Sequence, residues 1–201
     1  MLPARADFQE LKARFAGTAG AVRAGRERLF DTATPAIDAL LGGGIPYGSV
    51  AVLEGTGGRS LAAALLAGAT RSGLGAIIDG GELYPPSLEA AGVRLDRLMI
   101  VPARTPVEAA RAADVLLRSR ATRVVVMAAG ALRAAIWLRL ARLAQRAGAV
   151  LVLLASRTIA EVSAVAAVAL RCHAEPVLHG RGLWGAFVGL EVRTDVRRYK
   201  R

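Results

Sequence analysis

The chain has 201 residues, is 54% hydrophobic and carries a formal net charge of +11 at neutral pH. Its length and apolar content allow one domain with a sizeable core and exclude a protein that is disordered over most of its length. The charge favours an anionic partner such as nucleic acid. However, only Lys12 and Lys200 are lysines, and usage rich in Arg, Ala and Gly is also typical of a GC-rich coding sequence.

The first 28 residues predict a helical arm followed by a linker. Within residues 7–23, Phe8, Leu11 and Phe15 fall on one helical stripe, so the arm is expected to dock on its own core or on a neighbouring molecule. It carries no apolar signal core, and the single cysteine, Cys172, cannot form an internal disulfide. No apolar run is long enough to cross a bilayer. We therefore expect a cytoplasmic protein.

Residues 29–201 predict a single α/β core. Thr34 and Pro35 begin a short helix, which the glycines at 42–44 end. Short apolar runs, typical of strands buried on both faces, then alternate with helical stretches. The expected strands are 49–54, 75–79, 98–101, 123–128 and 149–155, and the expected helices are 60–72, 86–91, 106–119 and 131–147. This alternation indicates a mostly parallel central sheet flanked by helices.

The last quarter of the chain changes to an alternation of period two. In residues 187–196, apolar Val192 and Val196 alternate with Glu191, Arg193 and Asp195. Together with residues 166–172, this segment predicts antiparallel strands at the C-terminal edge of the sheet.

A glycine-rich loop follows the first core strand, where open parallel sheets bind their ligands. In a Walker A loop, G-x-x-x-x-G-K-[ST], backbone N–H groups wrap the phosphates and a lysine reaches them. Here Leu53 stands where the first glycine belongs, and Arg59 replaces the lysine, for which it is a poor substitute. The sequence therefore predicts a degenerate nucleotide or phosphate loop, although Arg59 and Ser60 at a helix N-terminus could hold a phosphate loosely. The loop consists of Gly55, Thr56, Gly57, Gly58, Arg59 and Ser60.

The acids that magnesium-dependent hydrolysis needs are missing from their expected places. Met127 and Ala128 end the strand that should carry the magnesium-holding aspartate. The nearest acids, Asp79 and Glu82, are expected to be hydrogen-bonded loop residues. We therefore expect no ATP hydrolysis, no catalytic residue and no cofactor. Neither histidine of the chain has cysteine or acidic companions at metal-ligand spacing, so no metal site is expected.

Two groups of basic residues are candidates for contact with DNA or other phosphates. One lies along the 131–147 helix and the other at the C-terminus. An exposed basic tail binds phosphates without reading sequence, whereas the helix arginines are also consistent with the solvated face of a core-packed helix. The candidates are Arg139, Arg142, Arg146, Arg197, Arg198, Lys200 and Arg201.

The order of these motifs resembles the RecA ATPase core over roughly residues 30–200. The resemblance is carried by TATPAIDALLGGGIPYGSVAVLEG (32–55), by GAIIDGGELYPPSLEAAGVRLDRLMIVPARTPVEA (75–109) and by the closing VRTDVRRYKR (192–201). The chain departs from that core in its phosphate loop, in Gly81 where a glutamate is expected, and in the short segments that replace the two DNA-binding loops.

A shortened RecA-like core with a decayed nucleotide site and a basic tail is similar to the ImuA family, SulA-related accessory proteins of damage-induced mutagenesis. The resemblance implies a non-catalytic accessory protein of translesion synthesis in the SOS response. Its implied partners are RecA and the ImuB polymerase-like subunit, with single-stranded DNA and further copies of the chain, docked through the arm, as additional candidates. Two other functions stay open: a small ATPase of recombination related to RecA or RadA, and a SulA-like inhibitor of the division protein FtsZ.

Overall fold

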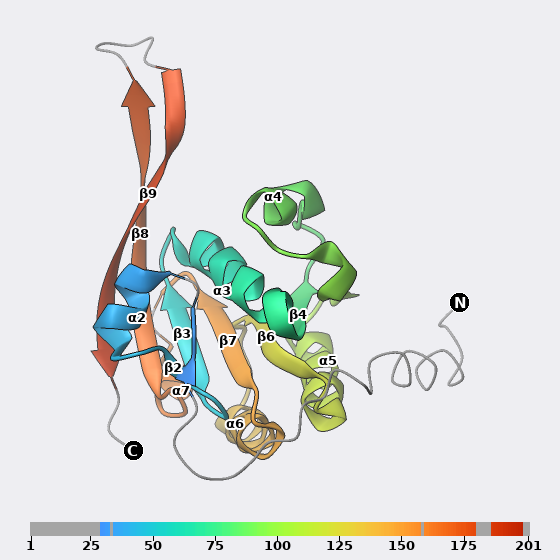
Figure 1. Cartoon of the computed structure of the whole chain (residues 1–201). Helices are drawn as coiled ribbons and strands as arrows, with labels where there is room; N and C mark the ends of the chain where they lie inside the picture. The colour runs from blue at the N-terminus through green and yellow to red at the C-terminus, as the bar shows by residue number, and fades with distance from the viewer. Residues whose placement is uncertain (1–28, 33, 158, 180–185, 199–201) are drawn as a thin grey trace.

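A computed structural model describes residues 29–32, 34–157, 159–179 and 186–198 (Figure 1). The predicted arm, residues 1–28 with Phe8, Leu11 and Phe15, lies outside the described residues, as do Lys200 and Arg201. Within the described part, no helix is long and apolar enough to cross a membrane.

The core of the protein is a seven-stranded sheet in the order β5-β4-β6-β7-β3-β8-β9. Every neighbouring pair from β5 to β8 is parallel, and only β9 is antiparallel, paired with β8 at the edge. The prediction of a mostly parallel sheet with antiparallel pairing at its C-terminal edge is therefore confirmed. The strands are β3 (Val50–Glu54), β4 (Leu74–Asp79), β5 (Leu98–Pro102), β6 (Thr122–Ala128), β7 (Val150–Ala155), β8 (Val168–His179) and β9 (Ala186–Arg198).

Helices cover both faces of the sheet, as the alternating pattern predicts (Figure 1). The helices α2, α3 and α4 pack on one face, and α5, α6 and α7 pack on the other. The helices are α2 (Pro35–Leu41), α3 (Gly58–Ser72), α4 (Pro85–Ala90), α5 (Pro106–Ser119), α6 (Ala134–Ala147) and α7 (Ala160–Ser163).

Two hydrophobic cores result, because successive residues of a strand point to opposite faces. In β3, Ala51 and Leu53 enter the core under α3, whereas Val50 and Val52 enter the core under α5 and α6. This two-sided burial explains why the central strands are continuous apolar runs.

The β8–β9 hairpin extends beyond the rest of the sheet (Figure 1). Its two strands are longer than the segments 166–172 and 187–196 that the sequence predicts. Val192 and Val196 pack against the core, and the alternating Glu191, Arg193 and Asp195 are exposed, as the period of two predicts.

Four short elements are not predicted by the sequence pattern. They are the strand pair β1 (Leu29–Phe30) and β2 (Ile45–Pro46), the 3₁₀ turn η2 (Leu95–Arg97), and α7. Elements of two to four residues carry too few positions to show a period, so they depend on tertiary contacts.

Candidate functional site

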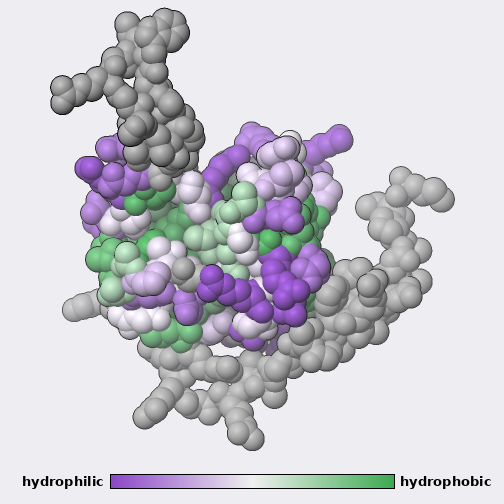
Figure 2. All heavy atoms as spheres, turned by 45° about the horizontal axis from the view of Figure 1, so that its top comes forward, coloured by the Kyte–Doolittle hydropathy of each residue, from purple (hydrophilic) through white to green (hydrophobic). Residues whose placement is uncertain are grey.

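The candidate site lies at the carboxyl ends of the parallel strands, where the glycine loop joins β3 to α3. A cavity of about 470 Å³ opens beside it, between α3, the end of β4 and α4. Figure 2 shows this end of the molecule, with pale and green apolar surface between purple hydrophilic margins. Its location agrees with the rule that ligands bind beyond the carboxyl ends of open parallel strands.

The backbone of the loop is hydrogen-bonded to the neighbouring strands. The Gly55 N–H donates to the carbonyl of Ala155 in β7 at 3.0 Å, and the Gly57 N–H donates to the carbonyl of Cys172 in β8 at 3.2 Å. The Thr56 Oγ1 accepts the N–H of Ala174, also in β8, at 3.1 Å. A phosphate loop directs such amides at its ligand, whereas these two amides are bonded within the chain.

The glycines of the loop are required by the close approach of β8 and β9. A Cβ on Gly55, whose φ is +94°, would lie 2.4 Å from the carbonyl oxygen of Cys172. A Cβ on Gly57 would lie 2.7 Å from a methyl of Val192. No side chain fits at either distance, so these two glycines have a packing reason that involves no ligand.

The cation of the loop is paired with an acid of the chain. The Arg59 guanidinium forms an ion pair with the Glu82 carboxylate, and the two side chains are 67% and 72% exposed. Because both groups remain in water, the pair contributes little to stability. It does place a carboxylate beside the arginine, where a bound phosphate would otherwise sit.

Asp79, the other acid near the loop, organises the turn after β4. Its carboxylate accepts the N–H of Gly81 at 2.7 Å and the N–H of Leu83 at 3.1 Å. The interpretation of Asp79 as a hydrogen-bonded loop residue is therefore confirmed. At the end of β6, Met127 is fully buried and Ala128 lines the cavity, so neither supplies a metal ligand there.

The cavity itself is mostly apolar, with charged residues on one side. Ala62, Ala63, Leu66, Ile77 and Leu88 form much of its wall. The carboxylates of Asp79 and Glu82 and the guanidinium of Arg59 border it. This lining suits an apolar group with one polar end better than a triphosphate.

The structure divides the predicted phosphate-contacting residues among separate elements. Arg139, Arg142 and Arg146 lie on α6, and Arg197 lies on the edge strand β9. The guanidinium of Arg139 forms an ion pair with the carboxylate of Asp114 in α5 at 2.8 Å, so Arg139 links α6 to α5. The side chain of Arg198 lies outside the described part of the structure.

Cys172 is a buried packing residue. Its side chain is buried in β8 beside the glycine loop. Burial raises the pKa of the Cys172 thiol to about 11. A hydrogen bond with Thr194 lowers this pKa, but its effect is smaller than that of burial. Among the described residues no group of histidine, cysteine and acidic side chains could hold a metal ion.

A second cavity, of about 410 Å³, joins the predicted phosphate contact Arg197 with Glu54 and Arg171, which no sequence motif singles out. Glu54, at the end of β3, is buried, and its carboxylate lies 3.8 Å from the guanidinium of Arg171 in β8. Both line this cavity with Asp195 and Arg197 of β9. The sequence signal was a carboxylate ending an otherwise apolar strand, but its partners come from strands far along the chain.

Comparison with known proteins places the fold. A family model described as the MT3502 N-terminal domain matches residues 38–158. A solved structure, the crystal structure of the RadB recombinase, is similar with a TM-score of 0.61 at 19% sequence identity. The similarity covers 82% of this chain and 94% of that chain. None of the curated proteins matches the chain. The fold is therefore RecA-like, as the sequence predicts.

Proposed function

The chain belongs to the MT3502 N-terminal domain family and has a RecA-like fold, and from this premise we propose that it is a non-catalytic accessory protein that acts by binding partners. The observation that carries the proposal is the packing of the glycine loop against β8. With the amides of Gly55 and Gly57 bonded to β7 and β8, the loop cannot wrap a triphosphate without breaking these contacts.

Two further features of the site support a non-catalytic function. Arg59 is paired with Glu82, which opposes an incoming phosphate. The strand β6 ends in Met127 and Ala128, and hydrolysis by a RecA-like ATPase needs an acid in that region to hold magnesium.

Within RecA-like proteins, we propose a function of the ImuA kind, in translesion synthesis during the SOS response. The support is the sequence resemblance together with a shortened core. β6 is followed by α6 after five residues, and β7 is followed by α7 after four, so neither connection holds an extended loop. The proposed partners are RecA and an ImuB-like polymerase subunit.

The first experiment is calorimetric titration of the full chain with ATP and magnesium. The expected result is no saturable binding at micromolar protein concentrations. Stoichiometric binding that is lost in Arg59→Ala but retained in the control Arg104→Ala would overturn the proposal, because Arg104 lies at the same edge and has the same charge.

The second experiment is co-purification with RecA and, separately, with an ImuB-like subunit. We expect the full chain to retain at least one of them, and deletion of residues 1–25 to weaken retention of RecA. Retention of neither protein would reject the proposed accessory function.

A small recombinase-type ATPase is the second candidate. The observation that favours it is the cavity of about 470 Å³ beside Arg59 and Ser60, at the N-terminus of α3. The calorimetric titration separates the two candidates, since an ATPase must bind the nucleotide.

A further inference from the structure

The amino ends of the parallel strands form a strongly basic edge, on the side of the sheet opposite to the glycine loop. The parallel topology brings four neighbouring strands together there, in the order β5-β4-β6-β7. Seven arginines lie within six residues before these strands or at the second position of β6, with Asp96 as the one carboxylate in the same segments. This basic edge consists of Arg71, Arg94, Arg97, Arg118, Arg120, Arg123 and Arg146.

The carboxyl edge of the same sheet is not basic. At the carboxyl ends of the same four strands, the last residue of each strand and the six residues after it include three arginines and four carboxylates. The formal charges of the two edges are therefore +6 and −1. A general excess of arginine in the composition would enrich both edges, so it does not explain this difference.

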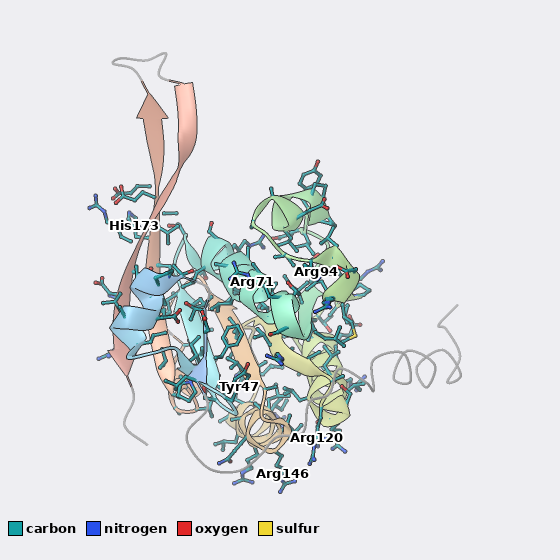
Figure 3. The ribbon with its side chains drawn as sticks, viewed as in Figure 1. Tyr47, Arg71, Arg94, Arg120, Arg146 and His173 are labelled. Atoms are coloured by element: carbon teal, nitrogen blue, oxygen red, sulfur yellow. The ribbon has the colours of Figure 1, made fainter. Side chains whose placement is uncertain are left out.

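Several arginines of the basic edge are available to a partner. Arg71, Arg120 and Arg146 are exposed, and no ion pair joins them to another described residue. Arg120 and Arg146 lie at the lower end of the molecule, where α5 and α6 end (Figure 3). Two other arginines of the basic edge form ion pairs: Arg94 with Asp96, and Arg118 with Asp114.

Arg120 also occupies a backbone conformation that favours glycine. It follows the last residue of α5 with a φ of +56°, and it is the one non-glycine residue with positive φ in the described part of the chain. The equivalent positions after α2 and α6 are Gly42 and Gly148. Because residues in strained backbone regions cluster at functional sites, this conformation makes Arg120 a candidate contact residue.

We propose that the basic edge binds the phosphate backbone of duplex DNA without reading its sequence. Four neighbouring strands span about 14 Å, and a duplex presents one phosphate charge per about 1.7 Å of its axis. A duplex therefore carries about eight phosphate charges along this length, both strands counted, which is comparable with the seven arginines of the edge. Arginine guanidinium groups bind phosphates in a bidentate geometry.

The absence of stacking residues favours a duplex over a single strand. Single-strand binding surfaces combine basic residues with exposed aromatic rings. The one aromatic residue in the described segments just before β3 to β7 is Tyr47, whose ring packs against Phe30 with centroids 5.9 Å apart. The edge thus offers charge without a stacking platform.

A structural explanation of these arginines makes a different prediction. Arg71, Arg118 and Arg146 lie in the last turns of α3, α5 and α6, where cations stabilise the helix dipole. If that were their whole function, removing them would lower stability and leave DNA binding unchanged.

The test is binding of a fluorescein-labelled 20-base-pair duplex by the full chain, followed by anisotropy at 50, 100 and 200 mM KCl. The edge variant is R71Q/R120G/R146Q, and the matched control is R104Q/R133Q/R157Q, which removes three exposed arginines from the carboxyl edge. We expect the edge variant to bind about 100-fold more weakly at 100 mM salt, with a log–log salt slope shallower by about 2.7, or about 0.9 per lost contact. The control should bind within about threefold of the parent chain.

The single variant R120G excludes misfolding as the cause, because glycine relieves the positive φ while the charge is removed. It should not lower the melting temperature, and it should make the salt slope shallower by about 0.9. Equal losses in the edge and control variants would overturn the proposal. It would also be overturned if polyglutamate, but not the duplex, bound in an edge-dependent way. The proposal does not depend on the accessory function, whose tests use nucleotide and partner proteins.

Discussion

Replacement of Gly55 by alanine tests whether the glycine loop is held by β8. A Cβ at this position would lie 2.4 Å from the Cys172 carbonyl oxygen, and the φ of +94° is strained for any L residue. The strain costs about 1–3 kcal/mol, and relief of the backbone clash costs about 1–3 kcal/mol more. The free energy of unfolding should therefore fall by about 2–6 kcal/mol.

Gly81 supplies the matched control. Its φ is +102°, but an added Cβ would have no atom within 4 Å. Gly81→Ala should cost the strain alone, about 1–3 kcal/mol. The difference between the two variants therefore isolates the contact with β8.

Urea denaturation measures the free energy of unfolding of both variants. The slopes of the transitions are compared among the variants. In a domain of this size, each 1 kcal/mol corresponds to about 2–4 °C in melting temperature. If Gly55→Ala and Gly81→Ala agree within about 0.5 kcal/mol, the loop does not depend on its contact with β8, and the main support for a non-catalytic site is lost.

Three further predictions concern other parts of the molecule. Arg120→Gly should raise the free energy of unfolding by about 0.5–1 kcal/mol, because relief of left-handed strain exceeds the added entropy of the unfolded chain; a fall in urea denaturation would contradict this. The Cys172 thiol should resist alkylation at pH 7.5 until the protein unfolds, and its contribution to stability should be constant below pH 9.0 and decline as the pH rises toward 11, because the folded state holds the proton more tightly. Rapid labelling of the native protein would show that Cys172 is accessible. Asp114→Ala should cost about 1 kcal/mol in low salt and less in 1 M salt, because it breaks the ion pairs with Arg118 and Arg139; equal losses in both salts would indicate that packing, and not charge, is responsible.

The element order of the sheet and the helices is predictable because it depends on local patterns. Apolar runs of five to seven residues, such as residues 149–155, indicate buried strands wherever they later pair. The capping of α5 is also local: Thr105 accepts the N–H of Glu108, three residues on. The prediction of a degenerate loop also rests on local information, since the shortness of the loop is a matter of sequence spacing.

The contacts that define the site were not predictable from local patterns. The pairing of Arg59 with Glu82 depends on the side-by-side placement of α3 and the end of β4. The hydrogen bond from Ala174 to Thr56 joins residues 118 positions apart. Sequence periodicity states which residues are buried but carries no information on which strand becomes the neighbour.

Residue pattern and spacing alone therefore determined the α/β class and the main strand and helix segments, and they are the basis of the prediction that the phosphate loop is degenerate. The tertiary structure decided that β8 lies beside β3, and with it that Gly55 and Gly57 serve packing. It also decided that arginines from separate segments converge on one edge. The physical reason is that secondary structure follows from interactions between near neighbours, whereas a site is assembled by strand order, which only the folded sheet determines.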